Sequence, residues 1–295
     1  MNVGIALSCY NHEEYLEQAI NSIIEQNYTD WQLVIFLNAS TDNSEKIAYK
    51  YKKLYPYKME VIPYFGDKVF PIGVARYLMM EHFIYSHIPF SSAYEVDLIC
   101  ILDADDFWRK DKLEKQVALY KKNNDNKLIF SDCYYYYQDS KIKQIENYPA
   151  FTEEKENVNL EETFHSKYPP LMDKPFESLL LKYNFMPCPT LLLERKALET
   201  VIGNPMPYTS AEDYDWVIKM TQKYKCAYVK EPLAYYRIHD KQLTQRASIR
   251  CTMEEIDVFK RFMKYLPYRK AQFHLFWLYC KLIYKEVNEI DKRNK

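Results

Sequence analysis

Short apolar runs alternate with amphipathic stretches over roughly the first 130 residues. Apolar runs at 3–7, 33–37 and 98–102 predict buried strands. Apolar positions at 15–24 recur every three or four residues, which predicts a helix with one buried face. Strand–helix alternation of this kind predicts an α/β fold with a mostly parallel sheet flanked by helices.

The rest of the chain divides into a polar connection and a helical end. Residues 138–175 are polar and contain several prolines, so we expect an irregular connection there. Beyond residue 246 no strand pattern remains, and two or three helices interrupted at Pro267 are expected. We therefore expect an α/β domain at 1–245 and a helical C-terminal extension at 246–295. Further regular structure is predicted at 59–62, 74–85, 111–122, 128–130, 176–183, 190–193 and 213–223, and a helix ends near 54.

The segment before the helix that ends near residue 54 is rich in helix-capping residues. Asp42 and Glu45 have the spacing of a capping box, in which side chains at the first turn bond to free backbone N–H groups. We therefore expect the helix to begin at this pair.

Composition narrows the classes of function. The chain of 295 residues has only 4 glycines, and it lacks both a P-loop and a Rossmann glycine fingerprint. Any phosphate site is therefore expected to use side chains instead of a glycine-rich loop. The net charge of −1 argues against a nucleic-acid partner, because such proteins usually carry a basic excess.

Cysteine usage and hydropathy bear on the compartment. The 7 cysteines are scattered, without the spacing of a zinc site, which favours a reduced, cytoplasmic protein. The N-terminus lacks the basic start and apolar stretch of a signal peptide. No apolar run approaches the ~20 residues of a membrane span. We expect a soluble protein or one bound peripherally at the inner face of a membrane.

Three carboxylates follow the apolar run at 98–102. Asp103, Asp105 and Asp106 would repel one another unless a cation neutralised them. Oxygen ligands favour Mg²⁺ or Mn²⁺, which also bind substrate phosphates. The alternative is a set of helix N-caps.

In its motifs the chain resembles the family 2 inverting glycosyltransferases of the GT-A fold. The resemblance runs in order through about 1–245 and includes a D-x-D motif at 103–105 and a Glu-Asp pair at 212–213. The matching segments are 6–11, 16–23, 26–28, 40–44, 75–76, 102–106, 211–213 and 236–239.

This resemblance implies a site for a nucleotide-diphosphate sugar. Ser8 and Tyr10 would line the nucleobase and ribose pocket, with Tyr10 stacked on the base. Asp103, next to Ala104, would contact the ribose or the metal. Asp105 would hold a Mn²⁺ or Mg²⁺ ion that bridges the two phosphates. The full set expected to contact the nucleotide is Ser8, Tyr10, Asn38, Arg76, Asp103 and Ala104.

Arg76 and His239 each have two possible roles. Arg76 would place a fixed positive charge near the nucleotide, or would be a solvated helix arginine. His239 would approach the metal or the diphosphate, and Arg237 beside it would contact a phosphate. Otherwise His239 is an ordinary loop histidine.

An inverting transfer also needs one general base, and the resemblance assigns it to Asp213. A carboxylate there would take the proton of the acceptor hydroxyl during a single displacement. Glu212 and Asp215 lie on the same turn and compete for the role. The alternative is an acidic helix start that complements the helix dipole.

One position departs from the family pattern. Asn38 stands where the family usually has an aspartate that accepts a hydrogen bond from uracil. Asn38 keeps a carbonyl acceptor but adds a donor, so UDP remains the expected nucleotide while other bases stay open.

The C-terminal segment is rich in aromatic residues interleaved with Lys and Arg. Three readings stay open: packing on the catalytic domain, a homodimer contact, or peripheral contact with an anionic membrane.

The expected function is metal-dependent inverting transfer of a hexosyl-type sugar from a nucleotide-diphosphate donor to a hydroxyl. The acceptor would be a glycan or lipid-linked glycan in bacterial-type surface polysaccharide synthesis. The alternatives are a nucleotidyltransferase and a non-catalytic glycosyltransferase-like binding module.

Overall fold

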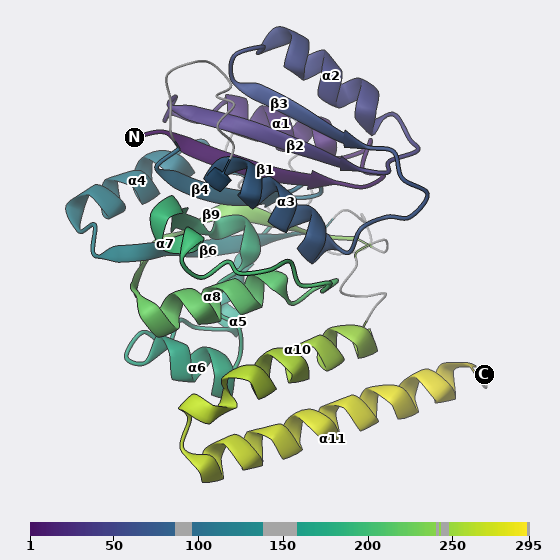
Figure 1. Cartoon of the computed structure of the whole chain (residues 1–295), viewed down its shortest axis with the longest axis vertical. Coiled ribbons are helices and arrows are strands. Elements are labelled where there is room, and N and C mark those ends of the chain that lie inside the picture. Colours follow the sequence, from purple (N-terminus) through teal and green to yellow (C-terminus); the bar gives the residue numbers. More distant parts are fainter. Residues whose placement is uncertain (86–95, 138–157, 240–241, 243–247, 294–295) are drawn as a thin grey trace.

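A single β-sheet runs through the protein in the strand order β3-β2-β1-β4-β8-β6-β9-β5, with β7 paired beside β6 (Figure 1). The structure is a computed structural model and describes residues 1–85, 96–137, 158–239, 242 and 248–293.

One half of the sheet is parallel. It comprises β1 (Val3–Cys9), β2 (Trp31–Asn38), β3 (Met59–Tyr64) and β4 (Leu98–Asp103). The predicted apolar runs form these strands, because residues buried on both faces need no polar alternation. In this register Ser8 lies beside Asp103, so the carboxyl ends of β1 and β4 share one edge.

The other half is mixed. β6 (Asn126–Tyr137) pairs in parallel with β9 (Lys225–Ile238), whereas β8 (Leu192–Glu194) lies antiparallel between β4 and β6. β5 (Phe107–Trp108) and β7 (Val158–Thr163) are also antiparallel to their partners. These antiparallel strands make the sheet less parallel than the periodicity predicted. β9 was missed because it is only partly buried and carries Lys, Glu and Pro among its apolar residues.

Helices cover both faces, as expected. Along β2, Leu33, Ile35 and Leu37 face one helical layer, whereas Val34 and Phe36 face the other. The first layer holds α1 (Leu16–Ile24), α2 (Ser44–Leu54) and α4 (Lys112–Lys122). The second layer holds α3 (Ile72–Tyr85), α6 (Pro175–Leu181), α7 (Arg195–Glu199) and α8 (Glu212–Lys223). Short turns form α5 (Phe164–Lys167), η1 (Cys188–Thr190) and η2 (Met263–Tyr265).

The C-terminal helices α10 (Ser248–Phe262) and α11 (Tyr268–Arg293) lie outside this second layer (Figure 1). Phe259 and Phe262 of α10 belong to the same apolar core as α3 and α8. The helical end and its break near Pro267 agree with the sequence pattern. The expected boundary at 245/246 falls at residues outside the described part of the chain.

Two local expectations were wrong. The cap of α2 is Asn43, whose side chain makes no capping bond; Asp42 instead accepts from the backbone N–H groups of Ser44 at 3.0 Å and Glu13 at 2.8 Å. Asp42 therefore ties the α2 start to the turn after β1, and the capping box with Glu45 does not form. Within the expected irregular stretch 138–175, residues 138–157 lie outside the described residues, but β7 and α5 form in the remainder.

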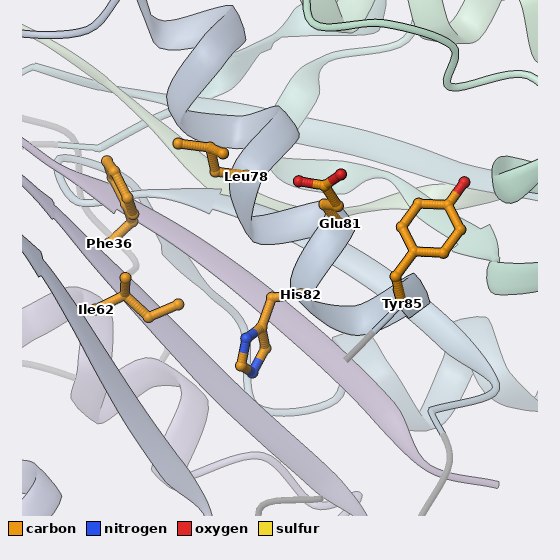
Figure 2. A pocket seen from close by; sticks show the side chains of 6 residues that line it. All are labelled: Phe36, Ile62, Leu78, Glu81, His82 and Tyr85. Carbon is orange, nitrogen blue, oxygen red and sulfur yellow. The ribbon is translucent and has the colours of Figure 1, made fainter. Parts of the chain in front are cut away.

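A hollow lies between α3 and the neighbouring strands β2 and β3. Figure 2 shows Phe36 and Ile62 of the strands opposite four side chains of α3. None of these residues belongs to the set predicted to bind nucleotide or metal. The α3 residues that line it are Leu78, Glu81, His82 and Tyr85. In the part of the chain that the structure describes, no helix combines the length and apolarity needed to cross a membrane.

Candidate active site

The polar residues predicted from sequence gather at the carboxyl edge of the parallel strands. Ser8 is the last residue but one of β1, Asn38 ends β2 and Asp103 ends β4. In an α/β sheet this edge forms the ligand crevice, because connecting loops open there. The site therefore lies where the fold class predicts it.

One buried guanidinium joins two carboxylates at this edge. Arg76 of α3 is 3% exposed and forms ion pairs with Asp103 at the end of β4 and with Glu212 at the start of α8. Asp103 also accepts a hydrogen bond from Ser8 Oγ at 3.0 Å. Burial of Arg76 excludes the reading of a solvated helix arginine. Its charge instead fixes the α8 start against the strand edge.

The two acids of the Glu-Asp pair, Glu212 and Asp213, differ in their surroundings. Burial raises the pKa of Glu212 to about 8, although the charge of Arg76 opposes the shift. Asp213 keeps part of its surface exposed, and burial also raises its pKa, again against Arg76. Glu212 is buried against Arg76, whereas Asp213 is the more exposed of the two carboxylates.

Asp215, the third acid on this turn, has a structural role. It is 1% exposed and forms ion pairs with Lys219 at 2.7 Å and with Arg261 of α10 at 2.9 Å. These pairs hold the Asp215 carboxylate inside the fold, between α8 and α10.

The loop that leads into α8 is held by α10. The Glu254 carboxylate accepts hydrogen bonds from the backbone N–H groups of Thr209 and Ser210, at 2.9 and 2.9 Å. It also accepts from the hydroxyls of both residues, at 2.8 and 3.0 Å. These four donors from the loop fix the backbone just before Glu212 and Asp213.

Asp105 lies between two histidines. His239 Nε2 is 3.1 Å from Asp105 Oδ2, and His12 Nε2 is 4.0 Å from the same oxygen. Burial opposes ionisation of Asp105, but the hydrogen bond from His239 and the proximity of both rings lower its pKa on balance. Asp103, Asp105 and Asp106 also place one oxygen each within 4.8 Å of one another. Both sets have the donor chemistry of a divalent metal site, with Asp105 in common.

Arg237 forms hydrogen bonds with both Asp106 and the backbone of Asp105. Asp106 is 2% exposed, and its Oδ1 accepts from the Arg237 backbone N–H at 2.8 Å. Burial, with the charges of Asp105 and Asp103, raises the pKa of Asp106. The Arg237 guanidinium donates to the Asp105 carbonyl at 2.6 Å and stacks on the rings of Tyr15, Phe107 and Tyr136. Arg237 is therefore anchored among aromatic rings near the site.

The residues expected to contact the nucleotide differ in exposure and in their hydrogen-bond partners. Tyr10 is 44% exposed and follows β1, where its ring is open to a stacking partner. The Asn38 amide bonds in both directions to the backbone of Phe70: Nδ2 donates to its carbonyl and Oδ1 accepts from its N–H, both at 2.9 Å. Ala104 is buried, and its N–H donates to the Ser8 carbonyl at 3.2 Å.

Sequence reasoning missed His12 and Glu254 as parts of the site. His12 directly follows the 6–11 motif, but nothing in its local pattern indicates a partner at Asp105. Glu254 bonds to residues 44 and 45 positions away, and its surface-like helical context gave no signal. Both are identified only by tertiary contacts.

The first part of the chain is similar in sequence to known glycosyltransferases. The model of the family described as Glycosyl transferase family 2 matches residues 5–83. An uncharacterized glycosyltransferase of Nostoc is 31% identical over 120 residues, which cover 41% of this chain and 33% of that protein. This chain thus spans about a third of that relative's length.

Two solved structures share the fold. TarS of S. aureus in complex with UDP-GlcNAc superposes with a TM-score of 0.60 at 13% identity, covering 100% of this chain and 93% of that one. The mannosyltransferase PcManGT of Pyrobaculum calidifontis, in complex with GDP-Man and Mn²⁺, also gives 0.60 at 13% identity, covering 96% and 73%. The chain therefore resembles glycosyl transferase family 2 over residues 5–83, and it shares the GT-A fold of these two glycosyltransferases.

Proposed function

We propose that the protein is an inverting glycosyltransferase that moves a hexosyl group from a nucleotide-diphosphate sugar to a hydroxyl. The observation that carries this proposal is the convergence of Asp105, His239 and the partly exposed Asp213 at one strand edge, linked through Asp103 and Arg76. A metal-compatible cluster and a separate carboxylate base are the two parts that this transfer needs.

Asp213 acts as the general base in this mechanism. Its carboxylate accepts the proton of the acceptor hydroxyl as that oxygen attacks the anomeric carbon, and the bond to the diphosphate breaks in the same displacement. A pKa raised by burial strengthens the base at neutral pH. Arg76 holds Glu212, and so the first turn of α8, against Asp103.

Asp105 and His239 would hold a divalent cation, Mn²⁺ or Mg²⁺. Once bound, such an ion neutralises charge on the departing nucleoside diphosphate. The fit is supported by donor atoms that converge on one oxygen of Asp105, and by the Nδ1 of His239, which is buried without a hydrogen-bond partner.

Tyr10 supplies a face for the base, and Ser8, Asp103 and Ala104 line the neighbouring edge. We propose a UDP-sugar as donor. Asn38 is engaged by the Phe70 backbone, so recognition of the uracil edge would require this pair to open. The bases bound by TarS and PcManGT, uracil and guanine, differ on the same fold.

We further propose a glycan or lipid-linked glycan acceptor and a cytoplasmic location for the protein. In this proposal residues 1–245 form the transferase domain and 246–295 a helical extension that packs on it.

Binding and transfer test the proposal separately. Calorimetric titration with UDP, GDP, dTDP and CMP, each with Mn²⁺ and with EDTA, should show metal-dependent binding of one nucleotide. Absence of binding under all conditions would instead identify a non-catalytic module.

Asp213→Asn should bind that nucleotide with unchanged affinity but lose transfer by about 10²-fold or more, because the general base is gone. Donor hydrolysis or transfer, measured by release of the nucleoside diphosphate, reports this loss. Asp215→Asn is the matched control on the same turn, and it should lose stability instead. Wild-type turnover by Asp213→Asn would remove Asp213 from the mechanism.

A further inference from the structure

His12 lies on the same side of Asp105 as His239 but belongs to a different segment. It follows β1, whereas His239 follows β9 and Asp105 follows β4. One nitrogen of each ring and one oxygen of Asp105 all lie within 4.8 Å of one another. The two rings meet edge to face, with centroids 6.3 Å apart.

These spacings suit a shared cation. Two atoms bound to one ion at about 2.1 Å each lie roughly 3 Å apart when adjacent and about 4.2 Å apart when opposite. The Nε2–Oδ2 distances of 3.1 Å for His239 and 4.0 Å for His12 fall in this range. The Nδ1 atoms of both histidines are buried without a hydrogen-bond partner, so the polar environment of each ring lies on its Nε2 side.

We propose that His12 is a protein ligand of the metal, so that His12, Asp105 and His239 form a two-histidine, one-carboxylate site. Imidazole nitrogens favour first-row transition ions, whereas Mg²⁺ prefers oxygen. The site therefore selects Mn²⁺, Co²⁺ or Zn²⁺ over Mg²⁺. This inference rests on the proposed function for the use of the ion, but not for its binding.

The test measures metal binding without donor or acceptor. The metal-free chain is titrated with Mn²⁺ and with Mg²⁺, and pulsed electron paramagnetic resonance counts the imidazole nitrogens on bound Mn²⁺. We expect two nitrogens and at least a tenfold preference for Mn²⁺ in the wild type. In His12→Ala we expect one nitrogen and Mn²⁺ affinity lowered about 10- to 100-fold.

His82→Ala on α3 is the matched control and should behave as the wild type. The wild-type nitrogen count needs no variant, so a misfolded His12→Ala would leave the test intact. A single nitrogen in the wild type, no Mn²⁺ binding, or unchanged affinity in a folded His12→Ala would overturn the proposal. Two nitrogens in a protein that transfers no sugar would contradict the proposed function alone.

A second inference concerns the outer face of α11 and is independent of the catalytic site. Ala271 and Leu278 of this helix are buried, and Lys281 and Lys285 reach back to Glu255 and Thr252 of α10 at 2.6 and 2.8 Å. These contacts fix which side of α11 faces the protein. In Figure 1 α11 lies on the far side of α10 from the sheet.

The opposite side carries an apolar stripe with a seven-residue repeat, in which large side chains are strongly exposed. Phe273 is 73% exposed, Phe276 is 66% and Tyr284 is 70%. Between 273 and 287 no charged residue falls within this stripe. Its members are Phe273, Phe276, Trp277, Cys280, Ile283, Tyr284 and Val287.

The stripe is large for a free surface. With ~200 Å² for an aromatic side chain, it exposes roughly 700 Å² of apolar area. Monomers rarely expose patches above ~600 Å². Two stripes facing each other would bury about 1,400 Å², within the ~1,200–2,000 Å² of stable interfaces.

We propose that the stripe pairs with the same stripe of a second copy about a two-fold axis. A seven-residue apolar repeat is the pattern by which helices pack side by side. A lipid surface fits less well, because Lys281 and Lys285 turn inward and leave no row of cations beside the described stripe. Cys280 lies seven residues from both Phe273 and Val287, so parallel and antiparallel pairing alike bring it close to its copy.

Sedimentation of the full chain from 1 to 100 µM tests this pairing. We expect a dimer that oxidation with diamide links covalently through Cys280. Cys280→Ser should remain dimeric without the link, and Phe276→Glu should be monomeric. Tyr57→Glu changes an equally exposed aromatic elsewhere and should leave the dimer intact. A monomeric wild type, a dimer unaffected by Phe276→Glu, or a monomer that sediments with anionic vesicles would overturn the proposal.

Discussion

Lys112 is a charged residue placed entirely inside the protein. Its Nζ bonds to Gln116 at 2.8 Å and lies 4.0 Å from the centre of the Trp108 ring. Burial lowers its pKa, with the nearby Cys100 opposing the shift. Because the unfolded chain binds a proton more readily than the folded one, this group makes stability rise with pH between its lowered folded pKa and 10.5.

Lys112→Met should remove that rise. The free energy of unfolding, measured by urea titration at several values between pH 7.5 and 9.5, should become less dependent on pH than in the wild type. Lys115→Met is the control, since burial opposes the charge of Lys115 but its ion pairs with Glu231 and Asp111 raise its pKa on balance. Equal pH slopes in Lys112→Met and the wild type would contradict the burial argument.

At the scale of elements, the strands that could be predicted are those with an uninterrupted run of apolar residues. β1, β2 and β4 are buried along nearly their whole length, so their sequences show them directly. β9 is only partly buried, and its partner β6 shifts register against it three times, which no local pattern shows. Asp103 and Asp105 were found because the end of an apolar strand marks them. The ion pair between Arg76 and Glu212 was not predicted, since the two residues are 136 positions apart.

The hydrogen bonds between Glu254 of α10 and the loop before α8 should affect the rate of transfer. Glu254→Ala frees the backbone at Thr209 and Ser210, so Asp213 should lose its fixed position and kcat should fall about 10- to 100-fold. The KM for the donor should change little, because the role proposed for Asp213 is on the acceptor. Initial rates below the unfolding temperature separate the two constants.

Glu255→Ala provides the neighbouring control for Glu254. Its carboxylate pairs with Lys281 of α11 at 2.6 Å and not with the loop before α8 in the described part of the chain, so kcat should remain near the wild-type value. Equal kcat in Glu254→Ala and Glu255→Ala would show that the hydrogen bonds of Glu254 do not position Asp213.

At the scale of the whole molecule, the site joins the two halves of the sheet. Asp105 follows β4 of the parallel half, whereas His239 follows β9 of the mixed half. A ligand bound to both should therefore oppose unfolding of the whole domain. At ~100 times its Kd such a ligand adds about 2.7 kcal/mol to the free energy of unfolding.

Mn²⁺ with UDP should thus raise the thermal unfolding temperature by several degrees, and EDTA should reverse the change. Differential scanning calorimetry measures both. Asp105→Ala should lose the metal-dependent part, while Asp30→Ala, at an exposed position just before the amino end of β2, should keep it. A full response in Asp105→Ala would exclude Asp105 as a ligand.

The sharing of Arg76 between Asp103 and Glu212 also bears on how this sequence can drift over time. A lineage that loses the guanidinium keeps two acids without a counter-charge, and one that loses Glu212 keeps a buried cation with half its neutralisation. Either single step is costly, so the tolerated routes change both positions together. Across descendants, residues 76 and 212 should therefore be inherited as one correlated pair, despite the distance between them along the chain.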